Sequence, residues 1–137
     1  MVEFIDHSDE VERWLKTEIP KALDDVGMFL QGEAGDELEN SPRRVDTGRL
    51  KLSVNYRVVQ DGEESVLYVG TNTRYAVYVH EGTGIYHPQG RQTPWIYRDE
   101  RGAFHQTRGM KPNRFLKNAI VKNEKQIEEY IQRRLKR

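Results

Sequence analysis

The tripeptide Asp46-Thr47-Gly48 has residue types and a spacing that could support catalysis. Asp-Thr-Gly carries the catalytic carboxylate in aspartic proteases, and in the retroviral type two such loops share a proton across a dimer axis. That chemistry needs the aspartate at the end of a buried strand, in a dry loop of small residues. Here Arg43-Arg44 precede the tripeptide and Arg49 follows it, and these charges do not suit a buried loop. A protease dimer around Asp46 is therefore kept only as an alternative, and no catalytic residue is predicted.

The same tripeptide has the properties of a structural elbow, formed by Asp46, Thr47 and Gly48. The Asp46 carboxylate can accept hydrogen bonds from the backbone N–H groups of Gly48 and Arg49 in an Asx turn. Gly48 tolerates a positive φ that other residues adopt only at a cost. We therefore expect these residues to redirect the chain from a first helix to a first strand, a role that needs no catalysis.

Two further patterns could bind a nucleotide or a metal ion, and neither is complete. Gly82 and Gly84 could belong to a phosphate-binding loop, but His87 stands where the dinucleotide fingerprint has its third glycine, and no Lys-Ser/Thr pair follows. His80-Glu81 and His87 do not have the helical His-Glu-x-x-His spacing of zinc enzymes. We therefore predict no metal site and no cofactor.

Three aromatic residues lie on a short predicted hairpin within residues 85–111, a segment that is rich in turn signals. Within it, residues 95–98 and 103–106 flank the turn 99–102 and predict a short exposed hairpin, which is too small to be stable alone. Exposed aromatic side chains usually pack against something, so Trp95, Tyr97 and Phe104 are predicted subunit contacts. Arginines are interleaved with them, which leaves stacking on nucleic acid open.

Two helices and three strands are expected to position these segments. Apolar residues recur at helical spacing from Ser8, a predicted N-cap, to about Glu39, and Pro20 predicts a kink or restart in that helix. Alternating patterns predict strands over 52–58, 65–70 and 75–80, joined as an antiparallel meander. A second amphipathic stripe predicts one long helix over about 113–137. The expected fold class is α+β, in one domain with a protruding arm.

The composition limits the function classes that need to be considered. The 137 residues fit one domain, and no apolar run approaches the roughly 20 residues of a membrane span. We expect no signal peptide, and the absence of cysteine excludes disulfides and thiolate metal sites. Residues 1–40 hold 12 acidic and 3 basic side chains, whereas residues 111–137 hold 3 and 9. These opposite charges predict either two helix faces that attract each other within one fold or contacts between neighbouring copies.

Three segments occur in a fixed order: Pro42 to Leu50, Tyr75 to Gly84, and Gly109 to Ile120. Together they resemble the neck or tail-completion (head–tail joining) protein family of long-tailed phages and prophages. The matching motif residues outside the elbow are Tyr75, Ala76, Glu81, Gly82, Thr83, Phe115 and Leu116. The chain departs from the family pattern at Arg43-Arg44, at His80-Glu81 and at Asn113, and each departure could alter how neighbours pack.

The resemblance implies a non-enzymatic structural protein that completes the tail or joins it to the head connector. It implies a homo-oligomeric ring, a hexamer or dodecamer, in the virion neck, assembled from protein made in the bacterial host cytoplasm. The expected partners are further copies of the chain, the head connector and the tail-tube or terminator proteins. The arm, residues 85–111, is expected to be mobile in the isolated protein and to reach one of these partners. A small basic nucleic-acid-binding module that uses the C-terminal helix is the remaining alternative.

Overall fold

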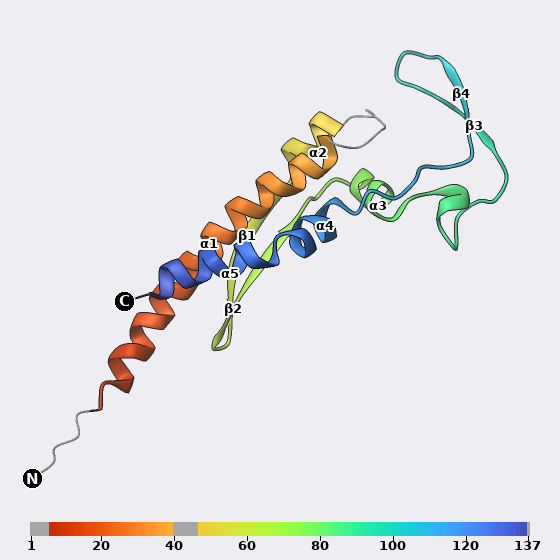
Figure 1. Cartoon of the computed structure of the whole chain (residues 1–137). Helices are drawn as coiled ribbons and strands as arrows, with labels where there is room; N and C mark the ends of the chain where they lie inside the picture. Colours follow the sequence, from red (N-terminus) through yellow and green to blue (C-terminus); the bar gives the residue numbers. More distant parts are fainter. Residues whose placement is uncertain (1–5, 40–46, 137) are drawn as a thin grey trace, which may run out of the picture.

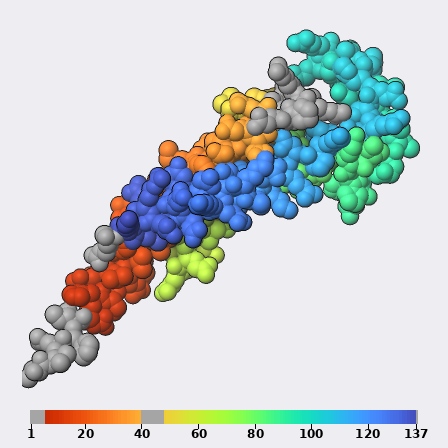
Figure 2. All heavy atoms as spheres, viewed as in Figure 1, coloured from red at the N-terminus to blue at the C-terminus, as the bar shows by residue number. Residues whose placement is uncertain are grey.

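The computed structural model describes residues 6–39 and 47–136 of the chain, which form an elongated α+β molecule (Figures 1 and 2). The predicted fold class is confirmed. In chain order the elements are α1 (Ser8–Glu39), α2 (Thr47–Ser53), β1 (Asn55–Asp61), β2 (Glu64–Gly70), α3 (Tyr75–Glu81), the short 3₁₀ turn η1 (Gly84–Tyr86), β3 (Trp95–Arg98), β4 (Phe104–Thr107), α4 (Phe115–Lys122) and α5 (Glu124–Leu135).

Helix α1 has 32 residues and is about 48 Å long at roughly 1.5 Å per residue. It runs through Pro20 without the predicted restart. Ser8 is the first residue of the helix and not its N-cap as predicted. The Asp6 carboxylate accepts a hydrogen bond of 2.9 Å from the backbone N–H of Ser8. That bond lowers the pKa of the Asp6 carboxyl. The helix ends at Glu39, as predicted.

The core lies along one face of the second half of α1. Val26, Leu30, Ala34 and Leu38 recur at intervals of four residues and are buried there. The other buried apolar residues of the core come from α2, α3 and α4 and from the link between α2 and β1: Leu50, Val54, Ala76, Val79, Phe115 and Ala119. The first turns of α1, before Ala22, contain no buried residue and extend beyond this core (Figure 1).

The predicted first strand is partly wrong, because residues 47–53 form helix α2 and the strand begins at Asn55. The alternation of Leu52, Val54 and Tyr56 suggested a strand face, but Leu52 is 87% exposed while Val54 is buried. Leu50 within α2 and Val54 directly after it are buried instead, and their spacing of four residues suits a helical turn. The hairpin β1–β2 that follows turns at Asp61-Gly62 as predicted, with Val58 opposite Leu67.

The predicted third strand is wrong, because residues 75–81 form helix α3. Their tyrosines and valines have strand propensity, yet the buried residues are Ala76 and Val79, which are three apart and share a helical face. Tertiary burial has overridden local propensity. The sheet is therefore the two-stranded β1–β2 pair, separate from β3–β4, and there is no three-stranded meander in the part of the chain described.

The predicted C-terminal helix is divided into α4 and α5 at Asn123. The Asn123 side chain donates a 2.8 Å hydrogen bond to the backbone oxygen of Ala119, and this bond competes with continuation of the helix. Both helices pack on α1. The ion pairs Lys122–Glu37 and Arg134–Asp25, each at 2.8 Å, join the basic C-terminal segment to the acidic helix within one chain.

Gly27 provides a test of the packing between α1 and β1. A Cβ atom at Gly27 would overlap the Tyr56 ring, 2.6 Å from its Cγ, whereas at Gly32 nothing lies within 4 Å. Alanine is favoured over glycine in a helix by about 0.8–1 kcal/mol, but overpacking costs about 1–3 kcal/mol. We predict that Gly27→Ala lowers the free energy of unfolding and that Gly32→Ala raises it, measured by urea denaturation. Equal stability of the two variants would contradict this packing.

Candidate subunit-contact surface

The base of the arm is an antiparallel pairing of two chain segments, residues 79–85 and 108–113. The backbone N–H groups of Thr83 and Ile85 donate to the oxygens of Met110 and Arg108 at 2.9 and 3.0 Å. The N–H of Met110 donates to the Thr83 hydroxyl at 2.9 Å, and that of Asn113 donates to the Val79 oxygen at 2.8 Å. The exit from α3 is therefore tied to the returning chain.

Two glycines allow these segments to approach so closely. Gly84 and Gly109 have φ values of 62° and 130°, and both are buried. A Cβ atom on Gly84 would lie 2.7 Å from the Cα of Gly109 and would overlap the backbone oxygen of Arg108. Neither position has room for a side chain, so the close pairing at the base of the arm requires both glycines.

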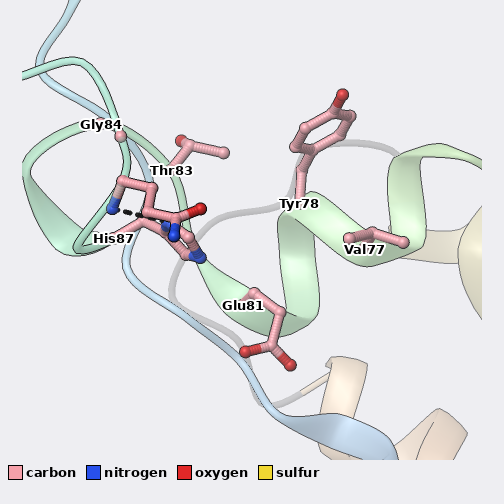
Figure 3. A pocket seen from close by; sticks show the side chains of 9 residues that line it. Val77, Tyr78, Glu81, Thr83, Gly84 and His87 are labelled. Atoms are coloured by element: carbon pink, nitrogen blue, oxygen red, sulfur yellow. Dashed lines mark hydrogen bonds between the residues drawn. The ribbon is translucent and has the colours of Figure 1, made fainter.

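A pocket of about 350 Å³ lies between α3 and the loop that follows it (Figure 3). Tyr78 and Glu81 project from α3, and Thr83 and His87 project from the loop (Figure 3). Val77 and Tyr78 are 62% and 56% exposed, so α3 presents apolar surface beside this pocket. The strand prediction for residues 75–80 could not indicate this patch, because it places Val77 and Tyr78 on opposite faces of a sheet.

The tip of the arm is the hairpin β3–β4, as predicted, and the turn between its strands is organised by Asp99. One carboxylate oxygen accepts from the N–H groups of Arg101 and Ala103 at 2.9 and 2.8 Å. The other lies 2.7 Å from Nε2 of His105. The hydrogen bond with His105, followed by that from Ala103, lowers the pKa of the Asp99 carboxyl. The turn is thus built around an ionised carboxylate.

The register of β3–β4 divides the aromatic residues between two faces. Tyr97 lies opposite His105 and stacks on it with ring centroids 5.3 Å apart, on the face that it shares with Trp95. Phe104 lies opposite Arg98 on the other face, which also carries Ile96. We call Ile96, Arg98 and Phe104 the outer face of the arm. Ile96 and Phe104 are 69% and 73% exposed, whereas Trp95 is half-buried beneath Arg91.

Two of the three family segments, Tyr75 to Gly84 and Gly109 to Ile120, meet at the junction of α3 and α4. Phe115 is fully buried, and its ring packs edge-on against His80 at 5.6 Å. The backbone nitrogen of Lys117 lies 3.5 Å from Nε2 of His80, and Nδ1 of His80 lies 2.7 Å from a carboxylate oxygen of Glu81. The hydrogen bond from His80 lowers the pKa of Glu81. The other motif residues form the same junction: Tyr75 and Leu116 pack on the core, Ala76 is buried, and Gly82 ends α3 with φ 81°.

Asn113, one of the departures from the family pattern, ties this junction to α1. Its side-chain amide donates to the backbone oxygen of Glu37 at 3.2 Å. This oxygen belongs to the last turn of α1, where carbonyl groups lack partners within the helix. Residue 113 thus acts on packing within the chain.

The predicted elbow is only partly described. Asp46 lies outside the described residues, so its Asx turn stays a prediction. Thr47 and Gly48 begin helix α2, and Gly48 does not have the positive φ that was expected. An aspartic protease needs this tripeptide in a loop that follows a buried strand, whereas the residues after Asp46 begin a helix. The local structure therefore does not favour the protease alternative.

Residues 3–82 match the family model HK97-gp10-like, described as bacteriophage HK97-gp10, a proposed tail component. The chain belongs to the HK97-gp10-like family. The match includes α1 to α3, with the first segment and the second as far as Gly82, and the arm follows it. Searches of curated proteins and of solved structures gave no significant match.

Membership of this family agrees with the resemblance in the segments that lie within residues 3–82 and places the chain among phage tail structural components. Among the described residues, no group of three His, Asp or Glu side chains could hold a metal ion. No helix in the same ranges is long and apolar enough to cross a membrane.

Gly84 provides a test of the base of the arm, with Gly62 as a matched control. Both have φ close to 60°, so alanine at either position costs about 1–2 kcal/mol. Only Gly84 also faces backbone atoms, since nothing lies within 4 Å of a Cβ at Gly62. We predict that Gly84→Ala destabilises the protein more than Gly62→Ala and speeds amide exchange at Thr83 and Ile85. Equal losses of unfolding free energy would mean that the base is not closely paired.

Proposed function

We propose that this chain is a non-enzymatic subunit of an oligomeric ring that completes the phage tail or joins it to the head connector. The observation that carries the proposal is the arm. Its base is held to the body by hydrogen bonds, while its outer face holds Ile96 and Phe104 in solvent. A two-stranded hairpin of this size gains little stability from itself and needs a partner surface.

A ring follows from the kind of contact that such an arm makes. An arm that projects from one subunit and binds a different surface on the next forms a head-to-tail contact, which closes into a ring when the rotation between subunits allows it. A hexamer or dodecamer in the virion neck is the expected form. The head connector and the tail-tube or terminator proteins are the expected partners above and below it.

The charge distribution supports contacts between copies as well as packing within one. Asp25 and Glu37 of α1 are paired with Arg134 and Lys122 of the same chain. The first turns of α1 lie beyond these pairs, where residues 6–21 hold five acidic and three basic side chains, while the arm carries five basic and two acidic residues. Opposite charges therefore remain at the two ends of the molecule, where neighbouring copies would meet.

Negative-stain imaging of concentrated protein tests the ring. We predict closed rings for the wild type and their loss in the double variant Ile96→Ser/Phe104→Ser, because the contact loses its apolar side chains. The matched control is Leu52→Ser, which removes a leucine that is 87% exposed on α2 and should leave rings intact. Wild-type protein that stays monomeric at every concentration would contradict the proposal.

A further inference from the structure

An acidic groove lies at the end of the molecule opposite the arm. It has a volume of about 390 Å³ and is formed between the first half of α1 and the tip of the β1–β2 hairpin. Leu15 and Ile19 are half-buried in it, and Glu12, Glu63 and Glu64 supply carboxylates. We call this the α1–hairpin groove. The elements that form it appear at the lower left of Figure 2 in red and yellow-green, at the other end from the arm.

The groove keeps a net negative charge. Lys16 also lines it and pairs with Glu12 at 3.4 Å. In the described ranges, neither Glu63 nor Glu64 takes part in an ion pair, and both side chains are exposed. An occupant with apolar side chains and positive charge would cover Leu15 and Ile19 and face these two carboxylates.

The outer face of the arm has this chemistry. Ile96 and Phe104 supply apolar surface, and Arg98 lies over the Phe104 ring at 5.7 Å. Arg101 lies in the adjacent turn and is exposed. Glu100 is the opposing charge in that turn, whereas the Asp99 carboxylate is directed to backbone N–H groups of its own turn and to His105.

The arm of one chain cannot reach its own groove, because the two lie at opposite ends of the elongated molecule (Figure 1). We propose that the outer face of the arm binds the α1–hairpin groove of a second copy. The inference rests on the proposed ring and names the two surfaces that form its repeating contact. Isoleucine does not stack on bases, and an apolar groove floor needs an apolar partner, so a second copy suits both surfaces better than nucleic acid does.

Thiol cross-linking tests the contact in the full chain, which has no cysteine of its own. Gln106→Cys places a thiol on the outer-face side of β4, and Ser65→Cys places one in the groove. A mixture of the two single variants should give a cross-linked 1:1 dimer with a short bifunctional reagent, and the double variant should give a ladder. The control replaces Ser65→Cys with Gln132→Cys, which is exposed on α5.

Charge reversal adds a test of specificity. Arg98→Glu/Arg101→Glu should reduce the cross-linked yield by roughly tenfold or more, because like charges would then face each other. Introducing Glu63→Arg/Glu64→Arg in the groove partner should restore it. Recovery in the combined pair is not expected of variants that merely misfold.

The remaining outcomes distinguish a failure of this contact from a failure of the proposed ring. Dimers formed by Gln106→Cys alone would show a symmetric arm-to-arm contact and overturn the proposal. Rings in the microscope without cross-linking above the control would overturn this contact and leave the ring standing. Protein that neither cross-links nor forms rings would overturn both. A salt-dependent affinity for duplex DNA that Arg98→Glu/Arg101→Glu abolishes would assign the outer face to nucleic acid instead.

Discussion

The burial of one face of α1 is the interaction on which the rest of the structure depends. The β1–β2 hairpin and helices α2, α4 and α5 all contact α1, whereas the two hairpins form separate two-stranded sheets. A core built along a single helix is thin, and it ends where the buried face of α1 ends, at Ala22 and Leu38. The acidic start of α1 and the basic arm therefore extend beyond the core in opposite directions, and this geometry suits a subunit that joins its neighbours.

The sequence predicted the elements whose signals are local. The end of α1 at Glu39 and the turns at Asp61-Gly62 and 99–102 follow from residues that act on their immediate neighbours. It failed at α2 and α3, where short apolar segments fit strand and helix equally well and the decision depends on which residues the core buries. The division at Asn123 depends on a side-chain hydrogen bond that competes with the helix, which periodicity does not reveal.

The candidate site was predictable in outline only. Exposed aromatic residues on a short hairpin indicated the arm, but the division of Trp95 and Tyr97 from Phe104 depends on strand register. Ile96, which is about as exposed on the outer face as Phe104, was not predicted, because an isoleucine in a strand pattern is more often a buried residue. The α1–hairpin groove could not be predicted from the sequence, since it joins residues near 12–19 to residues near 60–65, and only the fold brings them together.

Residue-resolved hydrogen exchange, in dilute and in concentrated protein, tests the central claim most directly. That claim is an arm fixed at its base and stabilised at its tip only by a neighbour. It predicts slow exchange at both concentrations for α1 from 22 to 38 and for the amides of Thr83, Ile85 and Met110. Amides of β3 and β4 should exchange rapidly in dilute protein and slowly after assembly. Arm amides that are as protected as those of α1 in the dilute monomer would contradict it.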